Sequence, residues 1–246
     1  NQKEAESFSG FHLRGGRHDG KDAQEAFRRQ KERPDLQGAL RQGVIFELDE
    51  RRHAAARHQV GHDARDASVR DMQRRFMVDT RQAQRVGRVA QQLYRQAQPR
   101  AGVEAHRELL WASALHEIGM MVSHHDHHRH SAYLLAHVDA AGFSQSQLRH
   151  LSALVLGQRG GLRKIETELS DEAFAWQVLC LRLAIIKCHA RSKVDASAIH
   201  VQADARDVVL RFPAGWAEAK PRSIFLFGEE LQFWNRTNVF RLTLQA

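Results

Sequence analysis

Histidines gather in one short stretch of this chain. Between positions 116 and 137 lie seven of its sixteen histidines: His116, His124, His125, His127, His128, His130 and His137. Imidazole can bind a metal when neutral, donate hydrogen bonds to phosphate when protonated, and carry protons between groups. The stretch therefore indicates metal, phosphate or proton-transfer chemistry. The simpler alternative is a solvated polar loop between two helices, in which one or two histidines cap a helix.

The adjacent pair His116-Glu117 ends an apolar helical segment, and further histidines follow it. This order resembles the HD superfamily of metal-dependent phosphohydrolases, in which an early His, an adjacent His-Asp pair and a distal Asp hold the metal. Arg85 takes the place of the early His and Ile185 that of the distal Asp. Because an arginine repels a cation and an isoleucine offers no lone pair, we expect no catalytic metal site of this type.

A looser metal site stays open as an alternative. Its ligands would be His116 and His124, together with either Glu117 or His128. Without a metal, we expect His116 to be a core histidine that is hydrogen-bonded to a neighbouring helix. Glu117 would then form an ion pair with Arg85 or with Arg129.

Helical periodicity dominates the chain after residue 63. Apolar residues recur at three- and four-residue steps, which predicts amphipathic helices. We expect helices over residues 82–96, 109–121, 131–137, 147–156 and 171–190. Their expected N-caps are Asp79 for the first, Ser144 for the fourth and Ser170 for the last. The last helix is apolar on nearly all sides, which is typical of a core helix.

The period changes near the C-terminus. Alternation over residues 199–202, 208–212 and 239–244 predicts strands, with a short helix over 228–234. The fold class we predict is mainly α, an HD-like helical bundle with a small α/β appendage at the C-terminus. The expected domains are an atypical, flexible or disrupted polar segment (1–63), the HD-like helical domain (64–195) and the α/β subdomain (196–246).

Composition limits the possible classes of protein. Apolar residues make up 42% of the chain, and no run of eighteen apolar residues could span a membrane. Two cysteines, Cys180 and Cys188, suit a reducing compartment and exclude a disulfide scaffold, so we expect a cytoplasmic protein. The net charge of +8 favours anionic partners. The tryptophans are expected to anchor the core: Trp111, Trp176, Trp216 and Trp234.

A longer series of motifs resembles the C-terminal half of the exopolyphosphatase and guanosine pentaphosphate phosphohydrolase (Ppx/GppA) family. The segments that carry this resemblance are Arg74-Arg75-Phe76-Met77-Val78-Asp79, Leu115-His116-Glu117-Ile118-Gly119, His128-Arg129-His130-Ser131-Ala132-Tyr133, Leu181-Arg182-Leu183-Ala184 and Leu210-Arg211-Phe212-Pro213. The resemblance covers residues 64–246, with an isolated patch at 38–48. The ordered series is specific, whereas the His-Glu pair alone would not be.

The resemblance implies a hydrolase that releases terminal phosphate from inorganic polyphosphate or guanosine pentaphosphate with the help of Mg²⁺. It places that chemistry on an N-terminal catalytic half with glycine-rich phosphate loops. Residues 1–38 do not resemble that half, residues 49–62 fit it poorly, and only the patch at 38–48 resembles its end. We therefore expect a truncated or frame-disrupted product that is inactive alone. Its helical domain would supply substrate-binding charge and homodimer contacts.

Seven basic side chains are the expected substrate-binding residues. They are His124, His128, Arg129, His130, Arg159, Arg163 and Lys164. Gly160 and Gly161 would let backbone N–H groups approach a phosphate oxygen, and the flanking cations would add charge-assisted hydrogen bonds. An ordinary solvated loop between helices is the alternative for residues 159–164.

Two other functions stay open. One is a self-sufficient HD-type metal-dependent phosphohydrolase that uses His116 and Glu117. The other is a non-enzymatic module that binds polyanions or nucleic acid. No helix-turn-helix, zinc-finger or RNP-like aromatic pattern is visible, so we expect no specific nucleic-acid partner.

Overall fold

The computed structural model describes residues 63–192 and 195–245. Its elements in chain order are α3 (Ala64–Arg75), α4 (Thr80–Ala97), α5 (Val103–Leu115), η1 (Ile118–Met121), α6 (His127–His137), α7 (Gln145–Gly157), η2 (Leu162–Ile165), η3 (Glu168–Ser170), α8 (Glu172–Lys187), η4 (Ala196–Ala198), β1 (His200–Asp204), β2 (Asp207–Arg211), α9 (Trp216–Ala219), α10 (Pro221–Asn235) and β3 (Arg241–Gln245). The expectations for residues 1–62 lie outside the described residues.

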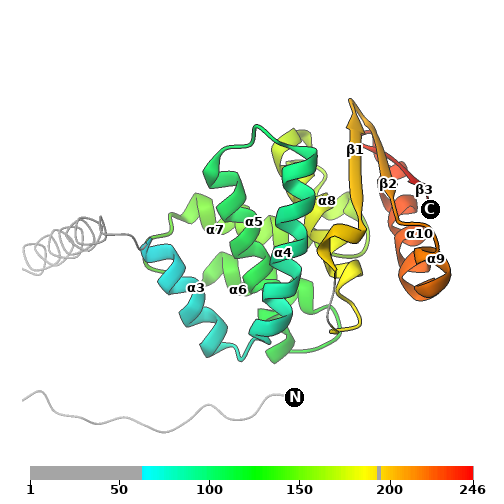
Figure 1. The fold of residues 1–246 in the computed structure, drawn as a ribbon. Helices are drawn as coiled ribbons and strands as arrows, with labels where there is room; N and C mark the ends of the chain where they lie inside the picture. Colours follow the sequence, from blue (N-terminus) through cyan, green and yellow to red (C-terminus); the bar gives the residue numbers. More distant parts are fainter. Residues whose placement is uncertain (1–62, 193–194, 246) are drawn as a thin grey trace, which may run out of the picture. The chain divides into compact units, whose positions relative to one another are not determined.

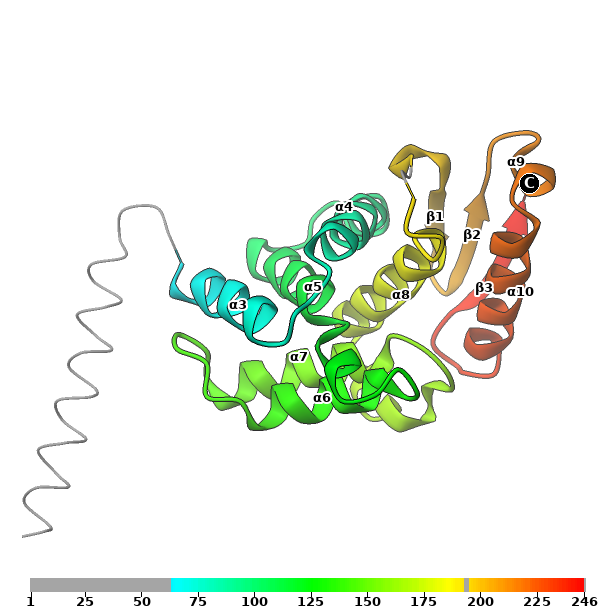
Figure 2. The ribbon, with the colours of Figure 1, turned by 90° about the horizontal axis from the view of Figure 1, so that it is seen from below.

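Helix α8 is the centre of the helical body. Nearly every side chain from Phe174 to Ala184 is buried, which confirms the prediction of a core helix. Figures 1 and 2 show α4 and α5 alongside α8, with α6 and α7 forming an adjacent pair. One continuous hydrophobic core extends from α3 to β3. Within the described residues, no helix combines the length and the apolar character that a membrane span needs.

Local side chains fix where several helices begin. Asp79 accepts a hydrogen bond from the Gln82 N–H at 3.0 Å, and Ser144 with Gln147 forms a capping box, so both predicted N-caps are confirmed. For α8, the prediction of Ser170 as N-cap is wrong. Asp171 caps this helix instead, because its carboxylate accepts from the N–H groups of the first turn while the Ser170 hydroxyl donates to Thr167.

The histidine stretch is more helical than predicted. Helix α6 begins at His127 rather than at residue 131, while α5 ends at Leu115 and continues only as the 3₁₀ turn η1. The chain turns here because Gly119 packs directly on the first turn of α6. A Cβ atom at this position would lie 2.2 Å from the carbonyl oxygen of His127. Only a glycine allows so close an approach of the two backbones.

The C-terminal part forms a three-stranded sheet in the order β1-β2-β3. Strands β1 and β2 pair as an antiparallel hairpin, and β3 pairs parallel to β2 with Val208 opposite Leu242. A parallel pair needs a crossover, which α9 and α10 provide. Helix α10 is longer than predicted, since Pro221 opens it at a position where its missing N–H costs no hydrogen bond. The fold class predicted from sequence, mainly α with a small α/β appendage, is confirmed.

A buried ion pair joins the helical body to α10. The Arg182 guanidinium binds both carboxylate oxygens of Glu230, with its Nη2 at 2.7 Å from Oε2, and its Nη1 donates to the Gly157 carbonyl at 2.6 Å. Trp234 donates its indole N–H to the same carboxylate at 2.6 Å. Arg182 and Glu230 are 1% and 4% exposed. These bonds join α10, which packs on the sheet, to helices α7 and α8 of the helical body. The predicted domain boundary at residues 195/196 stays a prediction.

We expect replacement of Arg182 by Met to destabilise the fold by about 3–5 kcal/mol, because Glu230 would be left charged in a buried site. Urea unfolding measures this change. The double variant Arg182→Met/Glu230→Met should cost clearly less than the sum of the two single variants. The exposed pair Arg74–Asp71 is the control, and Arg74→Met should cost less than about 1 kcal/mol. Additive single effects would contradict coupling across the pair.

Candidate functional site

His116 lies at the C-terminal end of α5 and is 1% exposed. Its Nδ1 is 2.7 Å from the Ser113 carbonyl oxygen, so Nδ1–H donates and Nε2 keeps its lone pair. Burial, with a smaller contribution from the nearby charge of Arg191, lowers the pKa of His116 to about 4, although the hydrogen bond to Ser113 opposes this shift. His116 is therefore a neutral core histidine, as expected, but its partner lies in its own helix rather than in a neighbouring one.

The backbone around His116 is held by two other helices. Its carbonyl oxygen accepts hydrogen bonds from the Ser131 hydroxyl at 3.1 Å and from the Gln158 amide at 2.8 Å. The Ser131 hydroxyl also accepts from the Gly119 N–H at 2.8 Å. These bonds satisfy a helix end that would otherwise be buried without partners. They fix α5, α6 and α7 relative to one another at this point.

Glu117 pairs with Arg191, so the expectation of a pair with Arg85 or Arg129 is wrong. The Arg191 Nη2 is 2.6 Å from Glu117 Oε1, and its Nη1 is 3.0 Å from Asp79 Oδ2. Arg191 follows α8 in a left-handed conformation with φ of 53°, which directs it back to the start of α4. Burial raises the pKa of Glu117, although the Arg191 charge opposes this rise.

The expected metal ligands do not converge. The Nε2 of His116 lies 3.7 Å from Glu117 Oε1, while His124 is exposed in the turn before α6. In the part of the chain that the structure describes, no three His, Cys, Asp or Glu side chains are arranged to hold a metal ion. An arginine cation lies beside Glu117 instead. The chemistry of this donor set does not fit a divalent cation.

The first turn of α6 buries two histidines. His127 and His128 are 7% and 5% exposed, and the Nδ1 atom of each has no hydrogen-bond partner among the described residues. Burial lowers the pKa of both to about 4, and the positive charges of Arg159 and Lys164 add to this effect. Both imidazoles are thus neutral near pH 7.

Four of the predicted binding residues come together between α6 and the loop after α7. We call them the cationic cluster: His128, Arg129, Arg159 and Lys164. The Lys164 ammonium donates to the Arg159 carbonyl at 2.6 Å. Burial lowers the pKa of Lys164 to about 8, and the positive charges of Arg182, Arg129 and Arg159 contribute. Since neither Arg159 nor Lys164 forms an ion pair with any described carboxylate, their charge is left without a permanent counter-ion.

The other three predicted binding residues lie outside this cluster. His124 is exposed, and His130 is half-buried on α6, and the side chains of both lack hydrogen bonds to described residues. Arg163 is exposed on η2 and lines a neighbouring cavity. The loop at 157–165 is therefore one end of the cluster and one wall of that cavity.

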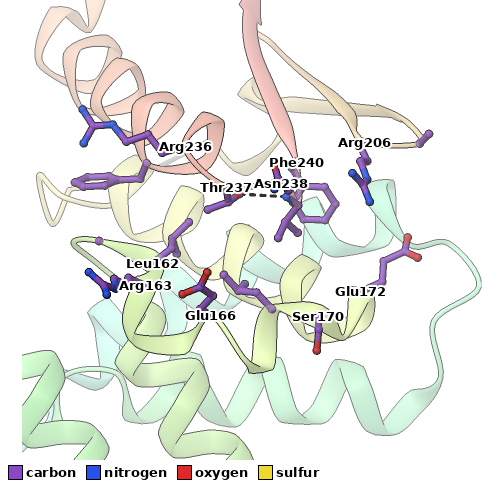
Figure 3. Close-up of a pocket in the computed structure, with 15 residues that line it drawn as sticks. Leu162, Arg163, Glu166, Ser170, Glu172, Arg206, Arg236, Thr237, Asn238 and Phe240 are labelled. Carbon is purple, nitrogen blue, oxygen red and sulfur yellow. Dashed lines mark hydrogen bonds between the residues drawn. The ribbon is translucent and has the colours of Figure 1, made fainter.

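The cavity has a volume of about 1110 Å³ and lies between η2, η3, the β1–β2 turn and the segment after α10. Figure 3 shows Arg163 and Arg236 at one end, and Arg206 near Glu172 at the other. Glu166 lies between these ends. Apolar residues form part of its lining: Leu162, Leu169, Phe233, Val239 and Phe240. Its charges are mixed, unlike those of the cationic cluster.

Sequence reasoning missed several residues that build this site. They are His127, Ser131, Gln158, Arg191 and the Arg182–Glu230 pair. A single arginine in an otherwise apolar helix was a signal for Arg182, because a buried charge requires a partner. No pattern pointed to Arg191, which acts far in sequence from Glu117.

The fold and its chemistry define a helical domain that concentrates positive charge at the ends of two helices. Residues 64–230 match the family described as Ppx/GppA phosphatase, domain III. The chain belongs to this family, which confirms the resemblance drawn from the sequence. The match extends from α3 to Glu230 of the buried ion pair, and the family is one of phosphatase-type hydrolases.

Gly119→Ala should lower the free energy of unfolding by about 1–3 kcal/mol, because the new methyl group would overlap the backbone of α6. Gly228→Ala is the matched control. Gly228 lies in α10 with open space around it, so alanine there should stabilise by about 0.5–1 kcal/mol. Urea unfolding of both variants measures the difference. Equal effects would contradict the close approach at Gly119.

The free energy of unfolding should fall as the pH drops from 6.5 to 4. In this window the unfolded chain binds protons on His116, His127 and His128, whereas the folded chain does not. The three histidines thus do not reduce the free energy of unfolding above pH 6.5, and they reduce it progressively as the pH falls towards 4. For each histidine, the free energy of unfolding changes by at most about 1.4 kcal/mol per pH unit.

Urea unfolding at pH 7.5, 6 and 5 measures this slope. His128→Gln should make the slope shallower, whereas the same change at exposed His125 should leave it unaltered. Equal slopes for the wild-type chain and the His128 variant would show that this imidazole is not held neutral by the fold.

Proposed function

We propose that this chain is the helical substrate-binding domain of an exopolyphosphatase-like hydrolase. The substrate class is a condensed phosphate chain, either inorganic polyphosphate or guanosine pentaphosphate. The domain would hold this polyanion on the cationic cluster. Cleavage of the terminal phosphoanhydride would take place on residues outside those that the structure describes.

One observation carries the proposal, the crowding of like charge around Lys164. Arg129, Arg159 and Arg182 all lower the pKa of this lysine, and only Asp126 opposes them as a nearby acid. Arg182 is already paired with Glu230, and Arg129 lies 3.8 Å from Asp126, so the unneutralised charge belongs to Arg159 and Lys164. A string of phosphates would supply the missing negative charge and accept charge-assisted hydrogen bonds.

Two neighbouring features support a binding role rather than a hydrolytic one. The neutral histidines offer buried Nδ1 atoms without partners, one within the cluster (His128) and one beside it in the chain (His127). The donor set at His116 and Glu117 does not suit a metal ion, because Arg191 supplies the positive charge there, and the Mg²⁺ that the family resemblance implies would belong to the N-terminal catalytic half. We therefore derive no step through a metal here, and the expected homodimer stays a prediction.

Binding of long-chain polyphosphate by the purified chain tests the proposal. The triple variant Arg129→Gln/Arg159→Gln/Lys164→Met should bind at least about tenfold more weakly, since it loses charge-assisted hydrogen bonds. The control variant Arg70→Gln/Arg88→Gln/Arg149→Gln removes three exposed cations elsewhere, with the same change in net charge. It should lose much less affinity, and rising salt should weaken all binding.

Equal losses in the two triple variants would show that only net charge matters and would contradict a defined cluster. Phosphate release in the presence of Mg²⁺ or Mn²⁺ is the second readout, and we expect none from this chain. Release that disappears in His116→Ala would contradict the assignment of chemistry to other residues, because it would place hydrolysis at His116.

A further inference from the structure

A second cavity lies where the end of α8 meets the start of α10. Its lining is basic, and it shares no residue with the cationic cluster. Its volume is about 530 Å³, within the range of about 300–1,000 Å³ that is usual for ligand pockets. We call it the α8–α10 pocket. The residues used below are Lys187, Trp216, Lys220, Arg222 and Ser223. Figure 2 shows α9 and the nearby end of α10 well apart from α6.

Positive charge dominates this pocket. Among the described residues that line it, the cations Lys187, Lys220 and Arg222 outnumber the carboxylate of Asp195. Lys187 is only 9% exposed, and its ammonium lies 4.2 Å from the centre of the Trp216 ring. Burial lowers the pKa of Lys187; Asp195 opposes this shift and Lys220 adds to it. Lys187 has no ion pair within 4.0 Å among the described residues, so a buried cation faces the cavity without a bonded anion.

The start of α10 adds hydrogen-bond donors to the same pocket. This helix has fifteen residues, and no side chain caps its N-terminus. Free N–H groups and the helix dipole make such an end favourable for an anion. Ser223 lies in the first turn, lines the pocket and is 5% exposed, and its hydroxyl has no partner among the described residues. Lys187 and Ser223 are thus two side chains of low exposure, 9% and 5%, which form no hydrogen bond with described residues and lie on different elements that line one cavity.

We propose that the α8–α10 pocket is a phosphate-binding site. A phosphate group would lie between the Lys187 ammonium, the Ser223 hydroxyl and the first turn of α10, with Lys220 and Arg222 at its rim. The ligand class is inorganic phosphate or the end of a short condensed phosphate. Because the pocket and the cationic cluster have no residue in common, this site does not depend on the function proposed above.

Trp216 provides the readout. It is half-buried next to Lys187, whereas the other three tryptophans, Trp111, Trp176 and Trp234, are at most 2% exposed. The prediction that Trp216 is a core anchor holds only for one side of its ring, which stacks on Phe212 at a centroid distance of 4.6 Å. A phosphate that binds beside Lys187 should therefore change the tryptophan fluorescence, and Trp216→Phe should remove that change.

The test is a fluorescence titration of the full chain with inorganic phosphate and, separately, with tripolyphosphate, at ionic strength held constant with chloride. We expect a saturable change with at least one of them. Saturation by inorganic phosphate identifies a site for a single phosphate group, and saturation by tripolyphosphate alone identifies a site for condensed phosphate. No saturable change with either ligand would overturn the proposal.

Variants separate this site from general charge. Lys187→Met keeps the apolar stem and should weaken binding about tenfold, and Ser223→Ala should weaken it severalfold, as expected for lost hydrogen bonds to a charged group. Arg70→Gln, which removes an exposed cation elsewhere, should bind as the wild-type chain does. If Lys187→Met impairs folding in a thermal melt, Ser223→Ala decides the question. Unchanged affinity in Ser223→Ala and in any folded Lys187→Met chain would overturn the proposal.

Discussion

The buried pair of Arg182 and Glu230 is the interaction on which the described structure depends. Two opposite charges lie in a core where either one alone would be strongly unfavourable. Both partners make further hydrogen bonds, because Arg182 also donates to the Gly157 carbonyl and Glu230 also accepts from Trp234. Helices α7, α8 and α10 are therefore held in one arrangement, and the small sheet cannot separate from the helical body without exposing this pair.

The same interaction determines where the site lies. Gly157 ends α7, and the loop that follows it carries Arg159 and Lys164. Because Arg182 holds the Gly157 carbonyl, this loop begins at a fixed point beside the first turn of α6. Burial is the main reason why the pKa of Lys164 is lowered, and the charges of Arg182, Arg129 and Arg159 add to it. The structural ion pair and the cationic cluster are thus parts of one network.

Neutral histidines and permanent cations have different roles in this domain. His116 and His127 are buried, so their charged forms are disfavoured and they act as packing and hydrogen-bonding groups near neutral pH. The arginines keep their charge at this pH, and in our proposal they attract the anion. Arg191 illustrates the difference, since its guanidinium pairs with both Glu117 and Asp79.

The sequence by itself determined the fold class, most helix positions and two N-caps, because apolar periodicity and capping are local properties. It also identified the family and the segments that carry the cationic cluster. Only the tertiary structure decided the partners. Glu117 meets Arg191, 74 residues away, and Lys187 and Ser223 line the same cavity, since such arrangements depend on how helices pack rather than on spacing along the chain. For the same reason the early start of α6 at His127 was missed, because it depends on the close contact with Gly119.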